Sequence, residues 1–138
     1  MNEYFLVDKS AWEQRRHSQI AADLLARLLS EDRVASCHVS ALEIQFSARN
    51  AREYLEQVEE RTALRWLPVS EVVMDRAMEV QVKLARKGQH RLPIPDLMIA
   101  ATAEIHGATV LHYDDDFDLI AAVTKQPAQW ILPCGTGG

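Results

Sequence analysis

Short apolar runs alternate with longer amphipathic segments along this chain. Five of the runs have the length, composition and polar or glycine boundaries typical of β-strands: residues 4–8, 34–38, 66–69, 109–113 and 129–132. The clearest is 109–113, because Gly107 precedes it and a row of aspartates follows it. The spacing between the runs is long enough for the crossover connections that parallel strands require.

Between these runs, apolar residues recur at helical spacing. Three segments place their members on one helix face: Ile20, Leu24, Leu25 and Leu28; Val73, Ala77, Val80 and Leu84; and Leu97, Ala100, Ala101 and Glu104. Gly88 and Gly107 follow the second and third segments and are expected to end those helices. Strands that alternate with helices predict a central parallel sheet with helices on both faces, a three-layer α/β/α domain.

Length and composition fit one packed domain. The chain has 138 residues, of which 48% are apolar and 25% are charged. We expect a single domain over residues 1–134 and a mobile glycine-rich tail over residues 135–138. The net charge of −5 gives no overall basic signature of nucleic-acid binding, although overall charge does not describe a local site.

The chain has no features of a membrane or secreted protein. No apolar run is long enough to cross a bilayer, and the first residues lack the basic and apolar regions of a secretory signal. The two cysteines, Cys37 and Cys134, are far apart and have no metal-type partner at short spacing, so we expect free thiols. These features predict a cytoplasmic protein without a membrane partner.

Four acids lie where an apolar segment meets the expected start of a helix: Asp8, Glu43, Asp96 and Asp114. Asp8 and Asp114 end predicted strands, and ligands of parallel α/β sheets bind beyond the carboxyl ends of the strands. Carboxylates that converge there repel one another, and Mg²⁺ or Mn²⁺ relieves that repulsion. Two such ions, roughly 3.5–4 Å apart, would bind both the attacking and the leaving oxygen of a phosphodiester.

Each acid also has a purely structural interpretation. Residues 40–43 have capping-box spacing, with Glu43 reaching back to the Ser40 amide, and residues 10–13 repeat that form, which leaves Asp8 as a loop acid. Asp96 and Asp114 are expected to cap or charge the helices that follow them. Taken singly, each acid is more typical of a cap, but their joint placement favours one shared site.

The chain resembles the PIN-domain ribonucleases, and within them the VapC-type toxins of bacterial toxin–antitoxin pairs. The resemblance covers almost the whole chain, through residues 6–11, 39–43, 47–49, 92–103 and 110–117. The stretch Pro95-Asp96-Leu97-Met98-Ile99-Ala100-Ala101 and the stretch Asp114-Asp115-Asp116-Phe117 are its most specific parts. His112 departs from the pattern, because the family often has threonine there.

The resemblance implies an endoribonuclease that hydrolyses RNA with Mg²⁺ or Mn²⁺. The four acids match the family's metal-site acids, and Asp116 matches a further acid that assists or replaces Asp114. Ser10 matches a hydroxyl that holds a metal-bound water or a backbone amide. The family also implies a homodimer and a small VapB-type antitoxin that blocks the site.

Binding of RNA requires basic residues that contact its phosphates. The candidates are Arg49, a turn and a half beyond Glu43, and the loop residues Arg86, Lys87 and Arg91. Two alternatives stay open at the level of sequence. A doubly wound phosphoacceptor or phosphohydrolase domain would need a cation near its aspartate, for which Lys9 and Lys125 are the nearby lysines. A non-catalytic binding module would use the acids only as helix caps.

Overall fold

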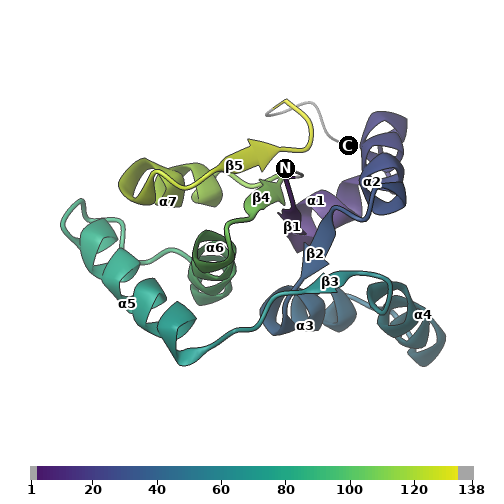
Figure 1. Ribbon diagram of the computed structural model, residues 1–138, viewed down its shortest axis with the longest axis horizontal. Coiled ribbons are helices and arrows are strands. Elements are labelled where there is room, and N and C mark those ends of the chain that lie inside the picture. The colour runs from purple at the N-terminus through teal and green to yellow at the C-terminus, as the bar shows by residue number, and fades with distance from the viewer. Residues whose placement is uncertain (1–2, 134–138) are drawn as a thin grey trace.

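The computed structural model describes residues 3–133 and contains a sheet of five parallel strands in the order β3-β2-β1-β4-β5 (Figure 1). The strands are β1 (Phe5–Val7), β2 (Val34–Ser36), β3 (Arg65–Trp66), β4 (Thr109–His112) and β5 (Ala128–Trp130). All five predicted strands are confirmed, each with somewhat different ends. The tail predicted for residues 135–138, and Cys134, lie outside the described residues.

Seven helices connect and cover the strands within the described part of the chain. They are α1 (Lys9–Gln14), α2 (Gln19–Ser30), α3 (His38–Phe46), α4 (Ala51–Arg61), α5 (Glu71–Ala85), α6 (Ile94–His106) and α7 (Asp116–Thr124). Helices α1 and α2 pack on one face of the sheet, and α5, α6 and α7 cover the other. The predicted three-layer α/β/α architecture with a parallel sheet is therefore confirmed.

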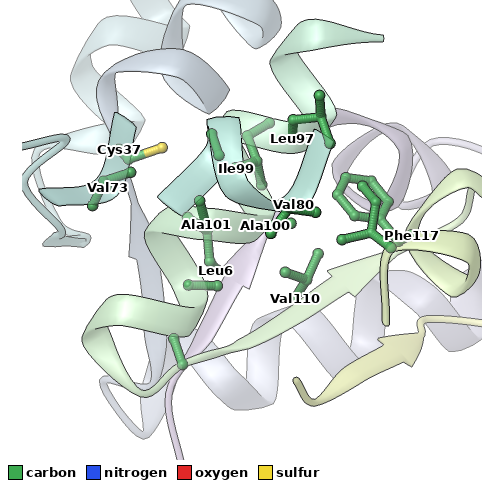
Figure 2. Close-up of a cluster of buried hydrophobic side chains, with 14 of the residues drawn as sticks. Leu6, Cys37, Val73, Val80, Leu97, Ile99, Ala100, Ala101, Val110 and Phe117 are labelled. Atoms are coloured by element: carbon green, nitrogen blue, oxygen red, sulfur yellow. The ribbon is translucent and has the colours of Figure 1, made fainter. Parts of the chain in front are cut away.

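Side chains alternate between these two layers along the central strand. Leu6 joins the core under α5 and α6, whereas Phe5 and Val7 join the core under α1 and α2, as the two-residue period of a strand requires. Figure 2 shows Leu6 and Val110 beside Ala100 and Ala101 of α6. These small alanines have little side-chain bulk, which lets α6 pack closely against the sheet.

The helix faces predicted from spacing are correct for α5 and only partly correct for α2. All four predicted α5 residues, from Val73 to Leu84, are buried. In α2, Leu25 and Leu28 are buried, but Ile20 is 72% exposed and Ala21 takes the inward position instead. The inward face observed in α2 is therefore shifted by one residue from the predicted face at the start of the helix. Ala21 is small enough to fit this inward position.

Two glycines end helices as predicted. Gly88 and Gly107 have φ values of 71° and 70°, a left-handed conformation that favours glycine. Cys37 is a buried free thiol. Across residues 3–133, no helix is both long enough and apolar enough to cross a bilayer.

Candidate metal centre

The acids predicted to converge do lie together at the carboxyl edge of the sheet. Asp8 follows β1 directly, and Asp114 follows β4, which pairs with β1. Glu43 lies on the helix after β2, the other neighbour of β1, and Asp96 lies in the first turn of α6. Because β1 is flanked by β2 and β4, segments from both ends of the chain meet here.

The acids form two overlapping groups. Asp8, Glu43 and Asp96, the inner group, each offer a carboxylate oxygen, and these oxygens lie within 4.8 Å of one another. Asp96, Asp114 and Asp116, the outer group, meet the same condition. Asp96 belongs to both groups, so it lies at the centre of the arrangement.

Asp8 acts as a helix cap with only one of its two oxygens. Its Oδ2 accepts hydrogen bonds from the Ser10 amide at 2.9 Å and from the Ser10 hydroxyl at 2.6 Å, and thereby caps α1. Its Oδ1 is buried and has no hydrogen-bond partner among residues 3–133. The structural interpretation of Asp8 as only a loop acid ahead of a helix cap is therefore wrong, because Asp8 is itself the cap, and one of its oxygens stays available to a ligand.

Ser10 links the two central strands at this edge. Its hydroxyl donates to Asp8 and accepts a hydrogen bond from the backbone amide of Tyr113 at 2.9 Å. The start of α1 is thereby fixed to the end of β4. Of the two roles expected for Ser10, the structure contains the contact with a backbone amide.

Glu43 does not form the capping box that its spacing predicts. Helix α3 begins at His38, with Cys37 as its N-cap, and the Ser40 hydroxyl accepts the Cys37 amide at 3.2 Å. Glu43 is thereby placed within the helix, where its half-buried side chain lies near Asp8 and Asp96, the other members of the inner group. Burial raises the pKa of the Glu43 carboxyl, the charge of Asp8 raises it further, and Lys9 opposes both effects.

Asp96 is the most perturbed acid of the site. It is 7% exposed, and its Oδ2 has no hydrogen-bond partner among residues 3–133. Burial, together with the charges of Asp8, Asp114, Asp116 and Glu43, raises the pKa of Asp96 to about 8, and burial is the largest of these causes. Without a cation, this carboxyl therefore holds a proton at neutral pH.

These properties fit a hard divalent cation. The donors are all oxygens, which Mg²⁺ and Mn²⁺ prefer, and two of them are buried without a partner in the described chain. A divalent cation would replace the proton on Asp96 and offset the repulsion within both groups.

The outer group is built on the turn between β4 and α7. Asp114 Oδ1 accepts a hydrogen bond from the Asp116 amide at 3.0 Å, which fixes the turn. Asp116 is the first residue of α7, and its pKa is raised by burial and by the charges of Asp114 and Asp115. Asp114 and Asp116 both belong to the outer group, so the structure does not exclude either of them as the fourth metal ligand.

His112 is hydrogen-bonded to the turn between β4 and α7 and packs against two aromatic rings. Its ring is fully buried, 5.1 Å from the Phe117 ring and 5.0 Å from the Trp130 ring, and its Nδ1 accepts the Asp114 amide at 3.3 Å. Burial lowers the pKa of His112. The side chain is therefore a neutral packing and hydrogen-bonding residue in the position where the family often has threonine.

The inner acids border an open hollow of about 280 Å³. Its lining consists of Asp8, Lys9, Ser10, Glu13, Glu43, Pro93, Asp96 and Asp114. The four candidate RNA-binding residues are not part of this lining. Arg49 has an 80% exposed side chain paired with Glu53, and Arg86, Lys87 and Arg91 are exposed around the loop between α5 and α6.

The structure adds Lys9 and Glu13 to the site, although neither was a sequence candidate for the metal site or for RNA. Their positions in the sequence were an indication that they lie near the acids. Lys9 follows Asp8 directly, and Glu13 lies one helical turn beyond it.

A parallel α/β/α domain with carboxylates gathered at its strand ends defines the structural class of this protein, and comparison with known proteins narrows that class. The model of the PIN domain family matches residues 5–123. Two curated relatives from Mycobacterium tuberculosis are similar over nearly their whole length. Ribonuclease VapC18 is 42% identical and covers 96% of this chain and 98% of the relative, and Ribonuclease VapC21 is 41% identical and covers 99% of each.

Solved structures have the same fold. A DNA-bound VapBC from Salmonella typhimurium matches with a TM-score of 0.76 at 16% identity, over 95% of this chain and all of that one. VapBC-5 from Mycobacterium tuberculosis matches with a TM-score of 0.65 at 25% identity, over 94% and 98% of the two chains. This chain belongs to the PIN-domain family, and its curated relatives there are VapC ribonucleases.

Proposed function

We propose that this protein is an endoribonuclease that hydrolyses RNA phosphodiesters with Mg²⁺ or Mn²⁺ held by the inner and outer acid groups. One observation carries the proposal. Asp96, shared by both groups, is buried, has an oxygen without a partner in residues 3–133, and has a pKa of about 8. An acid in that state destabilises the metal-free protein, which is typical of a site built for a cation. The ribonuclease relatives support RNA as the substrate.

The positions of the acids suit them to different roles in the reaction. Asp8, Asp96, Asp114 and Asp116 would hold the metal, which when bound lowers the pKa of water and offsets charge on the phosphate. Ser10 keeps Asp8 Oδ2 occupied, so Oδ1 is the oxygen that faces the ligand. Glu43 has a raised pKa and no helix-capping duty, which suits it to accept a proton from the attacking water.

Two alternative functions have less support. In a phosphoacceptor domain, a lysine near the aspartate would bind a phosphoryl group, and Lys9 does line the hollow. Membership of the PIN-domain family nevertheless favours a nuclease. Pure helix capping does not account for Asp8 Oδ1, Asp96 Oδ2 or the position of Glu43. Labelling by acetyl phosphate would support the phosphoacceptor domain. The absence of both labelling and metal-dependent RNA cleavage would support a binding module whose acids only cap helices.

The proposed function includes an inhibitory VapB-type antitoxin and action on RNA in the cytoplasm. Support for the antitoxin comes from fold neighbours, which were solved as VapBC complexes. Added in equal amount, such a protein should stop RNA cleavage. Undiminished cleavage in a stable complex would contradict the inhibitory role.

We also propose a homodimer formed through the outer face of α5. That face exposes Val72, Met74, Met78 and Val82. Exposed acids lie near the start of α5 and exposed bases near its end: Glu71 and Asp75, then Lys83 and Arg86. An antiparallel second copy would pair these ends while covering the apolar side chains. Light scattering after gel filtration tests this, and a monomer at high concentration would contradict it.

The central experiment compares the wild-type protein with Asp96→Asn on a labelled single-stranded RNA. Removal of a charged ligand should reduce cleavage by roughly 10³-fold, equivalent to several kcal/mol of transition-state stabilisation. Cleavage by wild type should also stop in EDTA and return with Mn²⁺. Circular dichroism should show that Asp96→Asn remains folded. Equal cleavage by both proteins would overturn the proposal.

A further inference from the structure

The acid hollow contains one positive side chain among the described residues that line it. Five of the lining residues are carboxylates: Asp8, Glu13, Glu43, Asp96 and Asp114. Lys9 is the exception, and it is the first residue of α1. The hollow therefore has a strongly negative interior with a single ammonium group at its border.

Lys9 has a fixed backbone and a loosely held side chain. On one side, the Asp8 amide donates to Leu111 O at 2.9 Å, and on the other, Ser10 contacts both Asp8 and the Tyr113 amide. The Lys9 side chain is 35% exposed, and its Nζ lies 3.8 Å from Glu13 Oε1. That separation is longer than a hydrogen bond, so the ion pair is weak and easily exchanged.

RNA must bring more negative charge into this region. The acid groups need their bound cations to offset their own repulsion, and a phosphodiester adds further anionic oxygens. The sequence candidates Arg49, Arg86, Lys87 and Arg91 do not line the hollow. Lys9 is thus the described cation best placed to meet a phosphate beside the metal-binding acids.

We propose that Lys9 binds a phosphate of the RNA at the border of the acid hollow. In the absence of RNA, Glu13 holds the Lys9 ammonium there, and a phosphate takes the place of Glu13 when RNA binds. This inference rests on the nuclease function proposed above. A lysine is suited to this exchange because its flexible stem carries a compact charge that can leave a weak partner for a phosphate oxygen. A merely structural Lys9–Glu13 pair would stabilise one helical turn and have no effect on RNA.

The test uses Lys9→Met, which keeps the apolar stem, Lys9→Arg, which keeps the charge, and Glu13→Gln, which removes the holding partner. RNA binding is measured by fluorescence anisotropy in the non-cleaving Asp96→Asn background, with a labelled single-stranded RNA. Loss of one charge-assisted hydrogen bond should weaken RNA binding by Lys9→Met roughly ten- to a hundred-fold. Lys9→Arg should recover most of this loss, and Glu13→Gln should bind RNA as tightly as its parent or more tightly.

Titration calorimetry with Mn²⁺, in proteins that retain Asp96, separates this role from damage to the site. Lys9→Met removes a positive charge beside the acids, so Mn²⁺ affinity should stay the same or increase. Unchanged RNA affinity in Lys9→Met, or a loss of Mn²⁺ binding together with a lower melting temperature, would overturn the assignment. Failure of the nuclease proposal is separate, because it would appear as metal-independent cleavage or as full cleavage by Asp96→Asn.

Discussion

The inner and outer acid groups share Asp96 but are assembled in different ways. The inner group draws one residue from each of three separate elements, and two of its members are buried. The outer group adds Asp114 and Asp116 from a single turn, and both are half-buried. The inner group therefore depends on the tertiary fold, whereas much of the outer group is determined locally. We expect the inner group to dominate both catalysis and pH dependence.

The largest expected effect comes from Asp8, because its two oxygens have different duties. Asp8→Asn keeps an oxygen that can cap α1 but loses the ligand charge, so cleavage should fall about 10³-fold with little change in unfolding free energy. Asp8→Ala should lose cleavage equally and also about 1 kcal/mol of stability through the missing cap. RNA cleavage assays and urea unfolding measure the two effects. Equal stability of the two variants would show that the cap contributes nothing.

The next effect is a dependence of stability on pH in the metal-free protein. Asp96 has a pKa of about 8 when folded and, as an ordinary aspartate, about 3.9 when unfolded, so the folded state binds more protons between these values. The free energy of unfolding in EDTA should therefore decrease as pH rises from about 4 to about 8, by roughly 2–4 kcal/mol between pH 5 and pH 8.

Two controls isolate Asp96 in that measurement. Asp96→Asn should have a flatter profile in urea unfolding, because it cannot ionise. Mn²⁺ should stabilise wild type most at the alkaline end, where the carboxylates are charged. A wild-type stability that increases across this range would contradict the cause assigned to the raised pKa.

The outer group allows a direct comparison between its two turn residues. Asp114 lines the hollow and fixes the turn through the Asp116 amide, whereas Asp116 does neither. Asp116→Asn should therefore reduce cleavage only about ten-fold, equivalent to about 1.4 kcal/mol, and Asp114→Asn should reduce it more. Single-turnover cleavage rates measure both. A larger loss from Asp116→Asn would reverse the order of importance within the outer group.

The smallest effect concerns Arg49, which lies outside the hollow. Its exposed side chain contacts Glu53, so Arg49→Ala should change stability by less than about 0.5 kcal/mol. If Arg49 contacts an RNA phosphate, the slope of log affinity against log salt concentration should decrease by about 0.7. Binding titrations at several salt concentrations measure it. An unchanged slope would remove Arg49 from the RNA surface and leave phosphate binding to residues nearer the acids.

Local sequence patterns predicted the features that depend on local geometry. The inward face of α5 and the glycine ends of α5 and α6 follow from helical spacing and from the conformational freedom of Gly88 and Gly107. Convergence of Asp8 with Asp114 also followed, because both were expected at the carboxyl ends of parallel strands.

Features that have an unusual or ambiguous local pattern, or that depend on neighbouring elements, were not predicted. The start of α3 was misplaced because Cys37 is an unusual N-cap, and Ile20 was assigned inward because α2 has two similar helical phases. The hollow position of Lys9 and the pKa of Asp96 depend on side chains from several elements. Spacing within one segment contains no information about either.

The pairing of β1 with β4 has a consequence for protein synthesis. The strand that precedes Asp8 is made well before its partner, the strand that precedes Asp114. A growing chain on the ribosome cannot bring these acids together until β4 has emerged. A partly translated chain that ends before β4 would therefore lack the complete acid site, and truncated products that end there would lack it as well.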